Sequence, residues 1–194
     1  EKTREVTTEI VTESLIRQQR ERFIREDFDT ALAYARLARR LNAEQTPAEV
    51  YEGMAQAHRR LAERLLGGES GAPGDEAPRD VDPVARAEAR AHYAAAGERF
   101  LDHARAILLS DDEAFADSLW MAADSFDLAS EPDRAIAAFS EFTEGRPEDP
   151  RQPAALLRLG QAHLALGDET AARTFFQQLI DQHPSSNEAV RAYV

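Results

Sequence analysis

Apolar and small side chains recur along most of this chain at the three- and four-residue spacing of an amphipathic helix. Two stretches show the spacing clearly: Phe28, Ala31, Ala35 and Ala38, and later Leu156, Leu159, Gly160 and His163. Residues 67–82 break the pattern, because they are rich in Gly and Pro and lack apolar periodicity. The pattern predicts helices joined by short turns over 3–25, 28–42, 47–66, 83–109, 111–129, 132–145, 152–166, 169–183 and 186–194.

Helix start signals support these boundaries. Capping boxes, in which a Ser or Thr side chain precedes a Glu by three positions, occur at 46–49, 110–113 and 185–188. They predict Thr46, Ser110 and Ser185 as N-caps. Asp82 followed by Pro83 restarts the chain after the long loop in the same way.

The chain contains an internal repeat of 34 residues. Residues 153–186 superpose on 116–149 and bring similar side chains together: Leu156 on Leu119, Gly160 on Ala123, Ala172 on Ala135, Phe176 on Phe139, and Pro184 on Pro147. Small residues let two helices approach closely, and the Phe side chains fill the space beside them. Gly167 supplies the positive φ of a tight turn, where the first copy has Ser130.

This pattern resembles the tetratricopeptide repeat, most closely in its C-terminal copy. The resemblance implies an all-α fold, a right-handed solenoid of antiparallel helix pairs in one domain. Within it, 1–66 would be degenerate N-terminal helices, 67–82 a loop, 83–115 a long helix and joint, and 187–194 a truncated or capping helix. The last copy is similar to bacterial envelope repeat proteins, such as Tol–Pal coordinators and outer-membrane assembly lipoproteins. The interrupted final helix suggests a fragment of a longer protein.

Composition narrows the function. The 36 acidic and 23 basic residues leave a net charge of −13, which argues against a nucleic-acid partner. There is no Cys, and no nucleophile, phosphate-loop or dinucleotide motif, so we expect neither catalysis nor a cofactor. The five His are not spaced as metal ligands, and no apolar run predicts membrane insertion. The Arg clusters at 17–25 and 59–64 alternate with Glu, which is typical of salt-bridged helix faces.

One helix face carries a candidate binding site. Asp117, Trp120, Asp124 and Asp127 recur at helical spacing, and Leu128 extends them. In the family that this chain resembles, the corresponding face lines a concave groove that binds peptides. Trp120 would then anchor a basic, partly apolar segment among carboxylates. In the alternative, Trp120 packs on the long helix before it and the Asp side chains are merely solvated.

The resemblance and the composition together predict a non-enzymatic protein–protein interaction module. Two alternatives stay open: a self-assembling structural spacer whose groove is filled by the helix at 83–109, and an accessory domain that regulates a larger enzyme or envelope protein. The sequence also leaves open homo-oligomer formation and the compartment, either the cytoplasm or a bacterial periplasm or cell envelope.

Overall fold

The computed structural model describes residues 2–67 and 81–192, with side chains from residue 7 onward. These residues form helices and connecting turns, with no strand among them. The helices are α1 (Lys2–Ile24), α2 (Phe28–Leu41), α3 (Ala48–Leu65), α4 (Pro83–Ile107), α5 (Asp112–Leu128), α6 (Pro132–Gly145), α7 (Gln152–Ala165), α8 (Glu169–Gln182) and α9 (Asn187–Ala192). The predicted helices are therefore confirmed, with ends that differ by one or two residues at most places.

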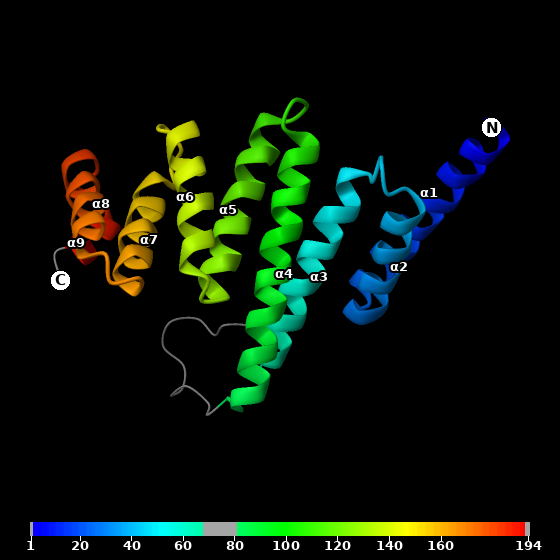
Figure 1. The fold of residues 1–194 in the computed structure, drawn as a ribbon, viewed down its shortest axis with the longest axis horizontal. Helices are drawn as coiled ribbons and strands as arrows, with labels where there is room; N and C mark the ends of the chain where they lie inside the picture. Colours follow the sequence, from blue (N-terminus) through cyan, green and yellow to red (C-terminus); the bar gives the residue numbers. More distant parts are fainter. Residues whose placement is uncertain (1, 68–80, 193–194) are drawn as a thin grey trace.

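The helices stand side by side in chain order, and the two ends of the chain lie at opposite ends of the row (Figure 1). Each helix packs mainly against the helices before and after it. Short connections make these neighbours antiparallel. The result is the helical solenoid that the repeat implies, and α3 with α4 forms its most extensive helix pair. The loop predicted at 67–82 lies almost entirely outside the described residues.

Side-chain caps fix several helix starts, but not all of the predicted ones. The carboxylates of Asp27, Asp82 and Asp168 accept hydrogen bonds from backbone N–H groups at the starts of α2, α4 and α8. The predictions for Ser110 and Thr46 were wrong. Their hydroxyls instead donate to backbone carbonyls of the preceding helix or its end, and Asp111 caps α5. A competing backbone acceptor three or four residues upstream explains the change.

The predicted cap at Ser185 is displaced by one residue. The hydroxyl of Ser186 accepts from the N–H of Ala189, and α9 begins at Asn187. A Ser-Ser pair offers two adjacent hydroxyls, so the capping pattern alone does not select between them.

Three turns between helices have the same geometry. Glu26, Ser130 and Gly167 have φ values of 59°, 61° and 79°. In each turn the next residue's N–H donates to a carbonyl five positions back, as in the bond of Asp168 to His163. Gly167 therefore takes the positive φ that the sequence predicts. Ser130 adopts the same conformation despite its side chain.

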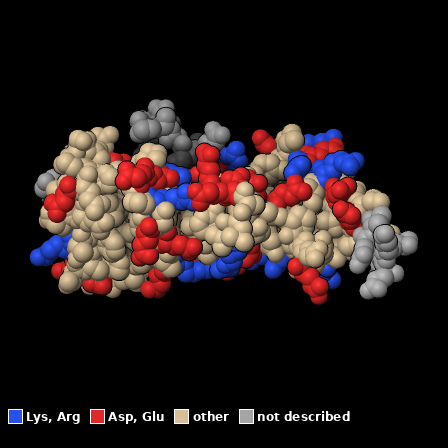
Figure 2. Space-filling view, turned by 90° about the horizontal axis from the view of Figure 1, so that it is seen from above, with Lys and Arg blue, Asp and Glu red and all other residues tan. Residues whose placement is uncertain are grey.

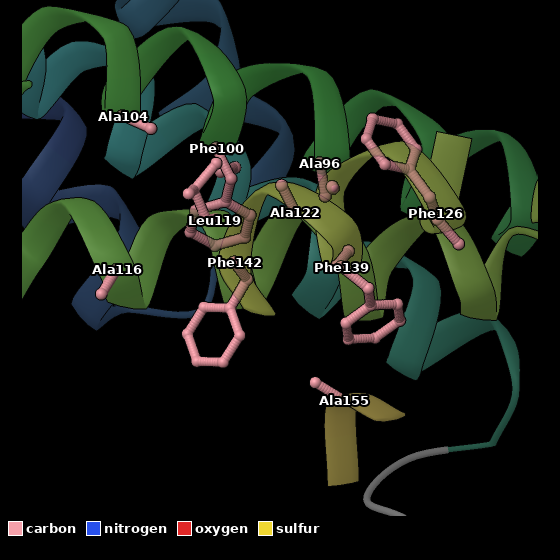
Figure 3. Close-up of a cluster of buried hydrophobic side chains, with 14 of the residues drawn as sticks. Ala96, Phe100, Ala104, Ala116, Leu119, Ala122, Phe126, Phe139, Phe142 and Ala155 are labelled. Carbon is pink, nitrogen blue, oxygen red and sulfur yellow. The ribbon is translucent and has the colours of Figure 1, made fainter. Parts of the chain in front are cut away.

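The largest cluster of buried side chains lies among α4, α5 and α6. Its fully buried rings are Phe126, Phe139 and Phe142, and Phe100 and Leu119 pack with them (Figure 3). Small residues between the helices make this packing possible. A Cβ on Gly97 of α4 would lie 2.5 Å from the ring of Phe126, and one on Gly160 would lie 2.2 Å from the ring of Phe176.

The repeat register is confirmed at its core positions. Ala135 and Ala172 are fully buried, and Phe139 is 1% exposed. Phe176 is partly buried and packs against the C-terminal cluster of Leu156, Leu157, Leu179 and Ala189. The residues that the repeat equates therefore occupy equivalent positions in two stacked helix pairs.

Candidate functional site

The predicted site residues Asp117, Trp120, Asp124, Asp127 and Leu128 lie on α5, and we call this group the α5 face. Trp120 is partly exposed. Its ring meets Phe139 and Phe142 of α6 nearly edge-on, with centroids 5.5 Å from each. Among the described residues no ring of α4 contacts it, so the indole is braced by the second helix of its own pair.

Arg151, at the start of α7, covers the indole. Its guanidinium carbon lies 5.7 Å from the Trp120 ring centroid and 5.1 Å from that of Phe142. Nη1 donates to Asp117 at 2.8 Å, and Nη2 donates to Asp149 at 2.8 Å. The hydrogen bonds from Arg151 to Asp149 hold the pKa of the Asp149 carboxyl below its usual range. One Arg thus bridges an aromatic ring and two carboxylates.

Asp124 and Asp127 bind arginines from both neighbouring helix pairs. Arg59 of α3 donates to Asp124 at 2.8 Å and to the hydroxyl of Ser125 at 3.1 Å. Arg158 of α7 forms an ion pair with Asp127, and its guanidinium lies 4.0 Å from Asp124. The ion pairs of Arg59, Arg151 and Arg158 with the α5 face link α3, α5 and α7, and we call them the Arg–Asp network.

Arg158 does not fully compensate the negative charge around Asp127. Burial raises the pKa of the Asp127 carboxyl, and the nearby charge of Asp124 raises it further, while Arg158 opposes both effects. Arg158 is itself 42% exposed. Leu128, 40% exposed, follows Asp127 directly. This end of the α5 face therefore combines an apolar side chain with a carboxylate that an additional cation would stabilise.

Helical spacing in the sequence predicts the carboxylates of the α5 face but not the arginines that bind them. A usable signal was present, because three Asp–Arg pairs join residues 34 positions apart: Asp112 with Arg146, Asp117 with Arg151, and Asp124 with Arg158. Each unit of a helical repeat protein contacts the units beside it. A spacing of one unit therefore brings Asp on one first helix to Arg near the next.

The arginine clusters pair both within and between helices. Arg60 binds Glu63 within α3, as predicted, and Arg25, which directly follows α1, binds Glu21 of that helix. Arg20 of α1 instead reaches Glu49 of α3. Figure 2 looks onto the edge where α4 ends and α5 begins, and shows acidic patches along the middle of the solenoid with basic side chains beside them.

Two histidines meet at the α3–α4 interface, which their spacing in the sequence did not reveal. The Nδ1 atoms of His58 and His92 lie 2.8 Å apart. Burial lowers the pKa of His58 to about 4, with further contributions from His92, Arg36 and Arg99. Between two neutral rings, one Nδ1 carries the proton and donates it to the other Nδ1, which accepts. The described residues contain no group of three or more His, Asp or Glu placed to hold a metal ion.

The packed helix pairs, the 34-residue unit and the three turns of equal geometry define a helical repeat protein. Residues 121–187 match the family model of the tetratricopeptide repeat. The matched segment covers α6, α7, α8 and about the C-terminal half of α5, and over this segment the chain is similar to the tetratricopeptide repeat family. Repeats of this family generally mediate protein–protein interaction and typically lack enzymatic activity.

A search of curated proteins gave no match to the chain. In the part of the chain that the structure describes, no helix is both long enough and apolar enough to cross a membrane.

Proposed function

We propose that this chain is a protein-binding module that recognises a partner segment through the α5 face. The observation that carries the proposal is Trp120, a partly exposed indole braced from behind by Phe139 and Phe142. A rigid aromatic side chain of this kind supplies contact area at low entropic cost. In this proposal the segment lies along the first helices α3, α5 and α7, which the Arg–Asp network links.

The proposed ligand is a segment with a basic side chain next to an apolar one. Its cation binds the carboxylates of Asp124 and Asp127, where burial raises the pKa of Asp127. Its apolar neighbour covers Leu128 and the open edge of Trp120. The cation competes with Arg158, whose 42% exposed side chain is free to turn toward solvent. The ligand's cation therefore replaces Arg158 in the ion pair with Asp127. A ligand is selected when its apolar side chain also packs against Leu128 and Trp120.

Peptide binding to the purified chain tests this proposal. Labelled peptide pools that carry Lys or Arg beside Leu are compared with pools of equal length that carry Asp or Glu beside Leu, by fluorescence anisotropy. We expect the basic pool to bind more tightly and its binding to weaken as salt rises through about 0.15 M, where exposed charges are screened beyond about 8 Å. Equal binding of the two pools contradicts the proposal.

Variants locate the binding. Trp120→Ala is expected to weaken binding about tenfold or more at every salt concentration, because it removes the aromatic anchor. Asp127→Asn is expected to weaken it about two- to fivefold, mainly at low salt. Asp133→Asn on α6 is the matched control, since Asp133 is exposed and forms no ion pair within the described residues. A loss of binding in this control as large as in Asp127→Asn places the site elsewhere.

The position of α4 argues against the alternative in which this helix fills the chain's own binding groove. α4 packs against α3 and α5 as the second helix of a pair. The ring contacts of Trp120 come from α6. The α5 face thus has no helix of the described chain laid across it, which supports a role in binding another molecule.

A further inference from the structure

A hollow of about 390 Å³ lies on the opposite side of α5, between the second helices α4 and α6. It is lined by Leu101, Ala104, Arg105, Phe115, Leu119, Phe126, Arg134, Ala137, Ala138 and Glu141. Core side chains form its floor, because Leu119, Phe126 and Ala138 are all less than 4% exposed. We call it the α4–α6 groove.

The next repeat fills the equivalent space with its own side chain. The repeat alignment places Phe175 of α8 on Ala138 and His163 of α7 on Phe126. Phe175 stacks on the His163 ring with centroids 5.3 Å apart and an interplanar angle of 20°. In the α4–α6 groove the corresponding residues are Phe126 and Ala138, so no ring occupies that position. The hollow therefore lies beside a position that carries a ring in the next repeat and a methyl group here, while Arg134 covers the Phe126 ring from one end.

The groove continues as an apolar stripe along α4. Leu101, Ala104 and Leu108 follow one another at helical spacing, and Arg105 lies beside them. Leu108 keeps helical backbone angles at the end of α4 and is 53% exposed. Arg134 lies at the other end, with its guanidinium carbon 4.1 Å from the Phe126 ring centroid and its nitrogens bonded to Glu98 and Glu131.

The charges along the α6 edge indicate the kind of partner. Glu141 lines the groove, and Glu144 continues the same stripe one turn later. Both are exposed, and neither forms an ion pair within the described residues. On the α4 edge, Asp102 balances Arg105. The edge along α6 therefore carries two exposed carboxylates, with no ion pair among the described residues, beside an apolar floor.

We propose that the α4–α6 groove binds an amphipathic helix of a partner protein, with a Phe or Leu anchor in the hollow and Lys or Arg beside it. The anchor takes the place that Phe175 occupies in the next repeat, and the basic side chains bind Glu141 and Glu144. Docking of an apolar helix face into a groove between helices is an established mode of recognition. This surface is separate from the α5 face and does not depend on it.

Designed helical peptides test the inference directly. The probe is a labelled peptide with Phe and Leu at i, i+3, i+4 and i+7 and Lys at the flanking positions. A matched peptide has Phe and Leu replaced by Asn, and a third has Lys replaced by Glu. We expect the first peptide to bind, the second not to bind, and the third to bind about tenfold more weakly.

Ala138→Phe supplies the missing ring from within the chain. We expect it to weaken binding of the first peptide about tenfold or more while the thermal unfolding temperature stays the same or rises. Ala33→Phe on α2 is the control, because Ala33 is exposed and far along the solenoid. Glu141→Lys, an exposed change that leaves the core intact, is expected to weaken binding about three- to tenfold and to favour the Glu peptide.

Three outcomes overturn the inference. The first is equal binding of the peptide to wild type and to both Ala138→Phe and Glu141→Lys. The second is loss of binding in Trp120→Ala, which would assign the peptide to the α5 face. The third is a dimer, seen by analytical ultracentrifugation, that Ala138→Phe dissociates, because the occupant would then be a second copy of this chain. Retained binding in Trp120→Ala together with loss in Ala138→Phe supports the groove even if the α5 face binds nothing.

Discussion

The helix pairs α5–α6 and α7–α8 follow one repeat pattern, yet their interiors differ. In α5–α6 three phenylalanine rings are fully buried: Phe126, Phe139 and Phe142. In α7–α8 the buried positions are aliphatic or small, and the rings of Phe175 and Phe176 remain partly exposed. The same pattern thus produces a dense aromatic core in one pair and a thinner core in the next.

Neighbouring helices account for this difference. α5–α6 lies between the 25-residue helix α4 and helix α7, so both of its sides are covered. Beyond α7–α8, among the described residues, lies only α9, which has six residues. In a solenoid each unit contacts only its neighbours, so a side chain's burial depends on the unit beside it as well as on its own position.

Removing the equivalent ring from each pair measures this difference most directly. Phe139→Ala is expected to lower the free energy of unfolding by about 3–5 kcal/mol, because a fully buried ring is lost. Phe176→Ala is expected to cost less, about 2–3 kcal/mol, because Phe176 is already partly exposed. Urea unfolding followed by circular dichroism compares the two. Equal losses would show that α9 covers α7–α8 as fully as its neighbours cover α5–α6.

The α3–α4 pair differs from both of these pairs, because its interface contains the polar contact between His58 and His92. Because burial lowers the pKa of His58 to about 4 from an unfolded value of 6.5, the unfolded state binds more protons between those values. The stability provided by neutral His58 is complete above about pH 6.5 and is lost as the pH falls toward 4. The expected loss is roughly 2–3 kcal/mol by the end of that range.

His58→Gln provides the control for this pH effect. A glutamine amide can still bond to His92 but does not titrate. We expect the variant to have a flatter stability profile between pH 7 and pH 4, measured by urea unfolding at each pH. A profile as steep as that of the wild type would assign the acid sensitivity to His92 and His103 instead, because burial lowers the pKa of both rings.

Two glycines test how tightly each pair is packed. Gly97→Ala places a Cβ 2.5 Å from the fully buried Phe126 ring, and we expect a loss of about 1–2 kcal/mol. Gly160→Ala meets Phe176 at 2.2 Å, but this ring is partly exposed and can move, so the expected loss is below about 1 kcal/mol. In Gly145→Ala, the control, the added Cβ has open space and should not destabilise the chain. A larger loss of unfolding free energy in Gly160→Ala than in Gly97→Ala would mean that the Phe176 ring is held more rigidly than its exposure indicates.

Sequence alone predicted the helices and the repeat register because both depend on local spacing. The 37-residue offset between the two copies correctly equated Ala135 with Ala172 and Phe139 with Phe176. Helix caps were harder to predict, since the hydroxyl of Ser110 chooses between a downstream N–H and an upstream carbonyl. That choice depends on backbone geometry that no short motif records.

The sequence predicted which residues of the candidate site share one helix face, but not which side chains of other helices contact them. Helical spacing placed Asp117 and Trp120 on one face of α5. It could not show that Arg151 covers the indole, because that contact comes from the next helix pair. The contact between His58 and His92 was missed for the same reason. Contacts between units depend on how the units stack, and the residue spacing within one helix does not determine that stacking.

The smallest expected effect is at the turns, where the two repeats differ by one residue. Ser130 and Gly167 have φ values of 61° and 79° and the same backbone hydrogen bonds. A residue with a Cβ is strained in this region, whereas glycine is not. Ser130→Gly is therefore expected to stabilise the chain by about 0.5–1 kcal/mol, and Gly167→Ser to destabilise it by about 1 kcal/mol. Thermal unfolding of the two variants and of the double exchange measures this. If the turns are equivalent, the two single effects add to nearly zero in the double variant. A remainder of more than about 0.5 kcal/mol would show that Ser130 also stabilises its turn through a contact of its hydroxyl group.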